Sequence, residues 1–207
     1  MVQAIEFFYR IYPNYGVAII LLTGAVKMLL YPLTKQSTQQ MRALQKLQPK
    51  VKELQEKFKS DPKEQQKRVM ELYQQEGANP LGGCLPMLLQ LPFFLGLFFA
   101  IRDMEFSGSG TSFLWISSLS QPDAGLITVV GLPISILVIL IGLATYLAQK
   151  TTPQAGQSGA SAMLITMPLF IAGISATFPA GVQIYWLVQT AITALQQMYI
   201  NRAADKA

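Results

Sequence analysis

The sequence has no histidine and a single cysteine, Cys84. One cysteine cannot form an internal disulfide, and without histidine the chain offers no Cys/His set for a metal, so we expect neither a metal nor a cofactor. Charged residues are also scarce, at 13% of the 207 residues, whereas 51% are hydrophobic. This balance is too apolar for an ordinary soluble domain and predicts an integral membrane protein.

Five apolar segments are long enough to cross about 30 Å of hydrocarbon. They cover residues 15–34, 82–101, 126–147, 161–178 and 182–200. Their continuous apolar runs favour helices, because every backbone group of a helix is satisfied within the segment itself. The predicted fold class is therefore an all-α integral membrane protein with five transmembrane helices.

The loops differ in charge, and this difference predicts the orientation of the chain. Region 35–80 is rich in Lys and Arg, whereas region 103–125 contains three acidic residues and neither Lys nor Arg. Cytoplasmic loops of membrane proteins carry the excess of cations. We therefore expect the N-terminus outside, and the basic region and the C-terminus in the cytoplasm.

Residues 1–14 differ from a signal peptide. Ile5, Phe8 and Tyr9 recur at helical spacing beside Glu6, which predicts a short amphipathic helix on the outer membrane surface. An N-terminus that crosses a membrane without a signal is unusual, which leaves open an export segment or domain ahead of residue 1.

Region 35–80 has the pattern of two amphipathic helices. Apolar residues recur every three or four positions from Met41 to Phe58, and Asp61-Pro62 supplies an N-cap and a first-turn proline for a second helix. We expect a cytoplasmic antiparallel hairpin whose first helix starts late or bends at Pro49. It serves either as a solvated spacer or as a lever that docks on a partner or the membrane surface. The predicted units are residues 1–14, 15–34, 35–80, 81–202 and a short cytoplasmic tail, 203–207.

Lys27 is the single cation inside the first apolar segment. A charge near the bilayer centre costs about 2.5–3.5 kcal/mol on insertion scales, so Lys27 needs a polar cavity or a route to the interface. It lies several residues from either end of its segment, which favours the cavity over snorkelling.

Other polar side chains are placed to share such a cavity. Thr23 lies one turn before Lys27, and Gln90 lies midway along the second span. The last span carries a polar stripe: Gln183, Trp186, Thr190, Thr193 and Gln197. Alternatively, Thr23 bonds its own helix, Gln90 bonds an adjacent helix, and Trp186 packs or anchors at the interface.

Five short motifs occur in order along the chain. They are Tyr31-Pro32-Leu33-Thr34-Lys35, Leu47-Gln48-Pro49-Lys50, Asn79-Pro80-Leu81-Gly82-Gly83-Cys84 followed by Pro86, Gln90-Leu91-Pro92-Phe93-Phe94, and Phe178-Pro179-Ala180-Gly181. Together they closely resemble the YidC/Oxa/Alb membrane protein insertases, over roughly residues 12–202. Most members of that family carry arginine where this sequence has Lys27, a change that keeps the charge but loses the planar guanidinium.

The resemblance implies a hydrophilic groove within the helix bundle, open to the cytoplasm and to lipid. Its residues here are Lys27, Thr23, Gln90, Gln183, Trp186 and Thr190. The implied function is to receive nascent membrane proteins in the groove and to release their helices into the bilayer, without covalent chemistry. The implied partners are nascent membrane proteins and the lipid bilayer, with the ribosome and a Sec-type translocon as further candidates and no nucleic-acid readout.

The resemblance also implies a bacterial plasma (inner) membrane, with the thylakoid membrane as the less favoured alternative.

Two other functions fit parts of the sequence. A small transporter or channel would use an intramembrane lysine, but the sequence has no internal repeat and no second intramembrane charge. A membrane-anchored scaffold would explain the hairpin but not Lys27.

Overall fold

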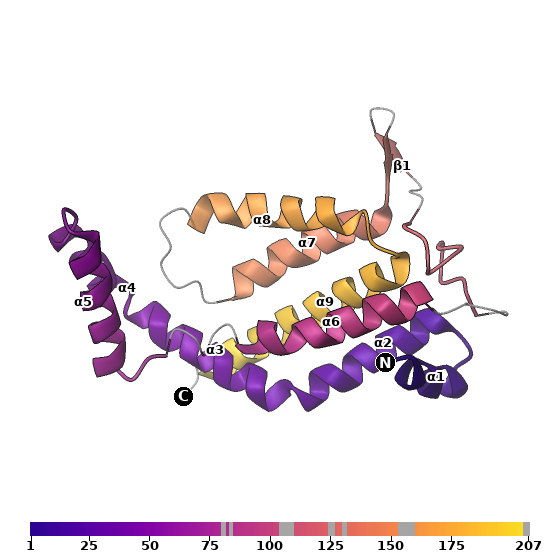
Figure 1. The fold of residues 1–207 in the computed structure, drawn as a ribbon, viewed down its shortest axis with the longest axis horizontal. Coiled ribbons are helices and arrows are strands. Elements are labelled where there is room, and N and C mark those ends of the chain that lie inside the picture. The colour runs from indigo at the N-terminus through magenta and orange to yellow at the C-terminus, as the bar shows by residue number, and fades with distance from the viewer. Residues whose placement is uncertain are drawn as a thin grey trace.

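A computed structural model describes residues 1–79, 82, 85–103, 110–123, 127–129, 132–152 and 160–204. In chain order the elements are α1 (Val2–Ile11), α2 (Tyr15–Leu29), α3 (Tyr31–Lys46), α4 (Gln48–Lys57), α5 (Pro62–Gln75), α6 (Leu85–Asp103), β1 (Ile127–Val129), β2 (Leu132–Ile134), α7 (Ile136–Thr151), α8 (Ala160–Ser175) and α9 (Ala180–Ala204). The molecule is elongated, with α4 and α5 at one end and the two strands at the other (Figure 1). Cys84 and tail residues 205–207 lie outside the described residues.

No helix in the described ranges is by itself both long and apolar enough for a membrane span. Helices α1 and α2 meet this criterion only as a pair, and they are bent by 110° at the residues between them.

Three of the predicted spans coincide with single helices. α6, α8 and α9 occupy the segments predicted at 82–101, 161–178 and 182–200, with boundary shifts of at most four residues. Pro92 lies inside α6 and Pro168 inside α8.

The first predicted span, residues 15–34, is not one continuous helix. α2 ends at Leu29, Leu30 has a ψ of 1°, and α3 begins at Tyr31. Pro32 explains the break, because it has no N–H to donate to the carbonyl four residues earlier and its ring clashes with that carbonyl. α3 therefore continues at an angle to α2 (Figure 1).

The third predicted span, residues 126–147, is helical only in part. β1 and β2 pair antiparallel, with Ile127 opposite Ile134, and α7 begins at Ile136. Residues 127–129 are all β-branched, which favours a strand, and Pro133 cannot donate the backbone hydrogen bond that a helix would require. The prediction of one helix over residues 126–147 is therefore wrong in its first part, and the helix of this segment is α7, Ile136–Thr151.

α4 and α5 lie side by side as an antiparallel pair. The helix is interrupted at Leu47, and Pro49 lies in the first turn of α4. The first helix of the predicted hairpin is therefore divided between α3 and α4. Asp61 caps α5 by accepting hydrogen bonds of 3.1 Å from two backbone N–H groups of its first turn. Across the pair, the side-chain amide of Gln65 donates to the carbonyl of Gln55 at 2.8 Å.

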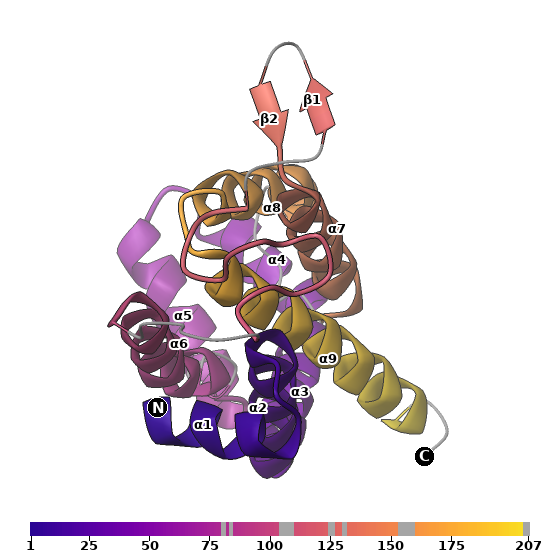
Figure 2. The same cartoon turned by 90° about the vertical axis from the view of Figure 1, so that its right-hand side faces the viewer.

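Residues 110–123, here called the strap, cross one end of the helix bundle (Figure 2). Strap carbonyl oxygens accept hydrogen bonds from the starts of two helices. The N–H of Tyr15 donates to the oxygen of Gly110 at 3.1 Å, and that of Ala180 donates to Gln121 at 2.8 Å. Helix starts leave unpaired N–H groups, so the strap satisfies donors of both α2 and α9.

The strap also contacts the start of α7. Ser135 caps α7 by accepting a hydrogen bond from the N–H of Val138 at 3.4 Å, and its hydroxyl donates to Oδ2 of Asp123 at 2.5 Å. Three helices from distant parts of the sequence are therefore joined through one segment.

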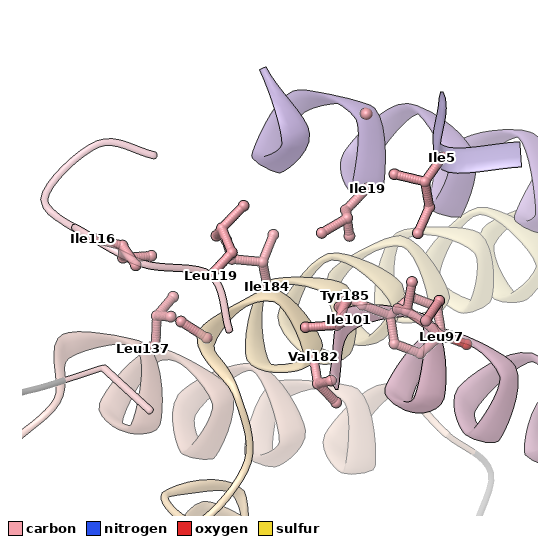
Figure 3. Packing of buried hydrophobic residues seen from close by; sticks show 13 residues of the cluster. Ile5, Ile19, Leu97, Ile101, Ile116, Leu119, Leu137, Val182, Ile184 and Tyr185 are labelled. Atoms are coloured by element: carbon pink, nitrogen blue, oxygen red, sulfur yellow. The ribbon is translucent and has the colours of Figure 1, made fainter. Parts of the chain in front are cut away.

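The main hydrophobic cluster lies at the strap end of the bundle. Its most deeply buried members come from α1, α2, α6, the strap and α9, and include Ile5, Ile19, Leu97, Ile101, Leu119 and Val182 (Figure 3). Burial of Ile5 places α1 against this cluster, whereas Glu6 and Arg10 are exposed. The core thus fixes the end of the bundle from which α2, α6 and α9 extend.

Candidate functional site

A cavity of about 490 Å³ lies among α2, α3, α6, α8 and α9. Its lining residues are Lys27, Thr34, Ser37, Thr38, Met41, Gln90, Leu91, Phe94, Thr152, Ile171, Trp186, Gln189, Thr193 and Gln197. Hydroxyl and amide groups predominate on the α3 and α9 sides, whereas α6 and α8 contribute mainly apolar side chains. The cavity is therefore amphipathic rather than uniformly polar.

Lys27 provides the charge of the cavity. It lies in the last turn of α2, where the helix dipole favours a cation. Its ammonium donates a hydrogen bond to Oγ1 of Thr193 on α9 at 2.8 Å. Among the described residues no carboxylate pairs with Lys27, so no side chain in that part of the structure neutralises its positive charge.

The α6 side of the cavity carries one amide side chain, Gln90, and a cluster of aromatic rings. The side-chain amide of Gln90 donates to the hydroxyl of Tyr185 on α9. The ring of Phe94 packs edge-on against Trp186, with ring centroids 5.5 Å apart, and edge-on against Phe178 at 5.7 Å. These contacts hold the bulky apolar groups on one side of the cavity.

The α3 side presents a row of hydroxyl groups. Thr34 donates to the carbonyl of Leu30 at 3.1 Å, and Thr38 donates to the carbonyl of Thr34 at 2.9 Å. Their hydroxyl protons are used within the helix, and their oxygen lone pairs are left for other donors. Because the helix is interrupted at Leu30, this row of hydroxyl groups on α3 does not continue the cavity-facing side of α2.

Hydrogen bonds tie the ends of α7 and α9 together beside the cavity. Oε1 of Gln197 accepts hydrogen bonds from Thr152 at 2.6 Å and from Thr151 at 3.3 Å. Asn201 donates to the carbonyl of Thr151 at 2.8 Å, and Arg42 donates to the carbonyl of Asn201 at 3.2 Å. These bonds connect α3, α7 and α9 at the end of the cavity farther along α9.

Three of the six residues predicted for the site lie in the cavity lining: Lys27, Gln90 and Trp186. The other three, Thr23, Gln183 and Thr190, do not. Thr23 is buried, and its hydroxyl donates to the carbonyl of Ile19 at 2.6 Å. Gln183 donates to the carbonyls of Ser175 and Phe178, both at 3.0 Å, and so fixes the turn between α8 and α9.

Several lining residues were not predicted. Thr34, Thr38 and Met41 share one helical face, and this spacing is the signal that identifies the α3 side. Gln189 lies three residues after Trp186 and four before Thr193, so it belongs to the same stripe of α9. Thr152 follows the end of α7, where periodicity gives no signal. In the described part of the chain, no three His, Cys, Asp or Glu side chains are grouped so that they could hold a metal ion.

The chain matches known proteins over nearly its whole length. Residues 7–207 match the family model described as 60Kd inner membrane protein. A protein from Citrifermentans bemidjiense, called membrane protein insertase YidC, is 39% identical over 203 residues, which is 98% of this chain and 36% of that protein. A protein of the same name from Geobacter sp. strain M21 is 38% identical over 205 residues, or 99% of this chain and 37% of that protein.

A solved structure is also similar. The crystal structure of an active YidC insertase with its first transmembrane domain resolved matches with a TM-score of 0.72 and 30% sequence identity. The match covers 94% of this chain and 44% of that one, and the chain spans less than two fifths of the two relatives above. The resemblance inferred from the five motifs is confirmed, and the chain belongs to the 60Kd inner membrane protein family, that of the YidC insertases.

Proposed function

We propose that this chain acts as a membrane protein insertase, which receives polar parts of nascent membrane proteins in the cavity and releases their helices into the bilayer. The observation that carries the proposal is a cavity of about 490 Å³ with an ammonium group that no described carboxylate neutralises. Relatives that match nearly all of this chain carry the insertase name, which supports the same function here.

The cavity would act by lowering the cost of moving peptide groups across hydrocarbon. An unsatisfied peptide group costs several kcal/mol in an apolar medium. Hydroxyls and amides of α3 and α9 would exchange hydrogen bonds with the crossing segment. Lys27 would attract its acidic side chains, while the apolar side formed by Leu91 and Phe94 would contact its apolar ones. No covalent step is required.

We further propose that α2, α6, α7, α8 and α9 are the membrane-crossing helices. The basic residues of 35–80 then lie in the cytoplasm with the α4–α5 pair, and the strap lies outside, as the excess of cations in 35–80 supports. The membrane is the bacterial plasma membrane, since the family is described as inner membrane proteins. In this orientation α1 lies on the outer surface.

Nascent membrane proteins and lipid are the proposed partners. The ribosome and a Sec-type translocon are further proposed partners, which would meet the chain on its cytoplasmic side and within the bilayer respectively. The exposed cations of the α4–α5 pair, including Lys57 and Lys63, give that side a surface suited to acidic or anionic partners.

Photocrosslinking tests the proposal. A photoreactive amino acid at Trp186, in the cavity lining, is expected to crosslink to a membrane protein that is being translated in the same membranes. The matched control carries the same amino acid at Ser117, an exposed strap position outside the cavity lining. Crosslinks should form at Trp186 and not at Ser117, and should disappear once the substrate is released from the ribosome and inserted.

Two results would count against the proposal. One is the absence of any translation-dependent crosslink at Trp186 when the chain is present at normal levels. The other is an ion current through proteoliposomes that contain the purified chain, because a channel and not an insertase conducts ions.

A further inference from the structure

Thr193 uses both hydrogen-bonding capacities of its hydroxyl. Its proton is donated to the carbonyl of Gln189, one turn earlier on α9, at 2.8 Å. The lone pairs of the same oxygen are therefore left for the Lys27 ammonium, which donates to it at 2.8 Å. The bond within α9 fixes the direction from which the hydroxyl can accept.

We propose that Thr193 is a positioning residue for Lys27, which holds the ammonium at the α9 side of the cavity with its remaining N–H groups directed to an acidic side chain of the substrate. This inference rests on the proposed function and assigns a role within it. Thr193 acts through Lys27 and need not touch the substrate itself.

The chemistry of lysine favours such a partner. An ammonium is a point charge on a flexible four-carbon stem, whereas a guanidinium is a planar fork that is pre-organised for a carboxylate. Lysine therefore loses more side-chain freedom when it is held in one place, and a fixed acceptor reduces that loss during substrate capture. One of its three N–H groups is used by Thr193, which leaves two for the substrate.

A second contact from α9 fixes the base of the same side chain. The side-chain amide of Gln196 donates to the backbone carbonyl of Lys27 at 3.4 Å. Thr193 and Gln196 thus bind the tip and the backbone of Lys27 from one helix. The ammonium can swing away from α9 only if the bond to Thr193 breaks.

The test uses variants that separate the hydroxyl from the shape of the side chain. Thr193→Val keeps the shape and removes the acceptor, and Thr193→Ser keeps the acceptor. For a substrate with acidic residues in its crossing segment, we expect Thr193→Val to lower the insertion rate about fivefold and Thr193→Ser to retain it. Thr177→Val, which also removes a threonine hydroxyl bonded to a backbone carbonyl but lies outside the cavity lining, is the matched control and is expected to leave the rate unchanged.

The same substitutions in a Lys27→Ala background show whether Thr193 acts through Lys27. We expect Thr193→Val to have no additional effect there, because residues that act as a unit are not additive. Neutral versions of the same substrate should be inserted equally well by the parent chain and by the Thr193→Val variant. An equal loss in both backgrounds, or an equal loss for acidic and neutral substrates, would overturn the assignment.

A chemical readout is independent of insertion. With Thr193→Val the ammonium is freed, so we expect Lys27 to react severalfold faster with a small amine-selective reagent, as measured by mass spectrometry, while Thr193→Ser should react like the parent chain. Unchanged reactivity in Thr193→Val overturns the positioning role. If the parent chain inserts no substrate at all but the reactivity changes as expected, the proposed function fails and the Lys27–Thr193 pairing stands.

Discussion

At the scale of single residues, two glycines of α2 have different roles. A Cβ added at Gly16 would lie 2.3 Å from Cγ of Phe113 in the strap, far inside van der Waals contact. At Gly24, two turns further along the helix, an added Cβ meets nothing within 4 Å. Gly16 therefore permits the strap to approach α2 closely, whereas Gly24 is not constrained by packing.

This difference leads to a stability prediction. Gly16→Ala should lower the free energy of unfolding by about 1–3 kcal/mol, because the added methyl group must displace Phe113. Gly24→Ala should leave it unchanged or raise it by up to about 1 kcal/mol, since alanine favours the helix. Thermal unfolding of the detergent-solubilised protein, followed by tryptophan fluorescence, measures both. Equal melting temperatures for the two variants would contradict the packing role of Gly16.

Of the residues that the sequence predicts for the site, three line the cavity and three lie outside its lining, for a physical reason. Lys27 was found because a charge in an apolar segment needs a polar environment. Thr23 has suitable spacing, but its hydroxyl is used by its own helix, which is one of the two interpretations that the sequence left open. Periodicity defines the face of a helix, but it does not tell which neighbouring helix covers each turn of that face. The substrate-binding role of Lys27, Gln90 and Trp186 is a proposal.

At the scale of elements, the strap connects parts of the chain that are far apart in sequence. Its link to α7 depends on Ser135, which both caps the helix and donates to Asp123. Removal of this one hydroxyl therefore affects two elements at once.

Ser135→Ala should cost about 0.5–2 kcal/mol of stability, the usual range for loss of an N-cap. Faster hydrogen exchange is expected in the first turn of α7 and in the strap around Asp123, because both lose a hydrogen-bond partner. Ser135→Thr retains the hydroxyl and should exchange like the parent chain. Ser117→Ala, at an exposed strap position, controls for a change in the strap alone. Faster exchange in α7 without any change in the strap would contradict the role of the Ser135–Asp123 hydrogen bond in holding the strap to α7.

The sequence predicted the positions of the helices better than it predicted the places where a helix is interrupted. Apolar runs locate α6, α8 and α9 to within four residues, and Asp61 marks the start of α5. Pro32 divides the predicted first span, and residues 127–129 and 132–134 form strands although hydropathy alone favours a helix there. A hydropathy pattern measures how apolar a segment is, whereas breaks depend on local backbone geometry, so the two signals can disagree.

At the scale of the whole molecule, the α4–α5 pair and the strap lie at opposite ends (Figure 1). If the proposed orientation holds, these ends face opposite sides of the membrane. Positions 57 and 117 are both exposed and mark the two ends.

Cysteine accessibility tests this orientation. In a chain with Cys84→Ser, a membrane-impermeant thiol reagent added outside intact cells should label Ser117→Cys and not Lys57→Cys. After the membrane is opened, both positions should be labelled. Labelling of Lys57→Cys in intact cells would reject the proposed orientation, and equal protein levels of the two variants serve as the control.

The arrangement of the bundle also sets an order of events during synthesis. Lys27 and Thr193 are separated by 166 positions, and a ribosome makes the first long before the second. α9 supplies Val182 to the core as well as the only described hydrogen-bond partner of the Lys27 ammonium. A chain stalled before α9 therefore exposes a charge that lacks this acceptor, beside a core that lacks one of its helices. α9 emerges after the other described helices and completes the core and the cavity in a single step, so a chain made only up to α8 would have neither a finished core nor a finished site.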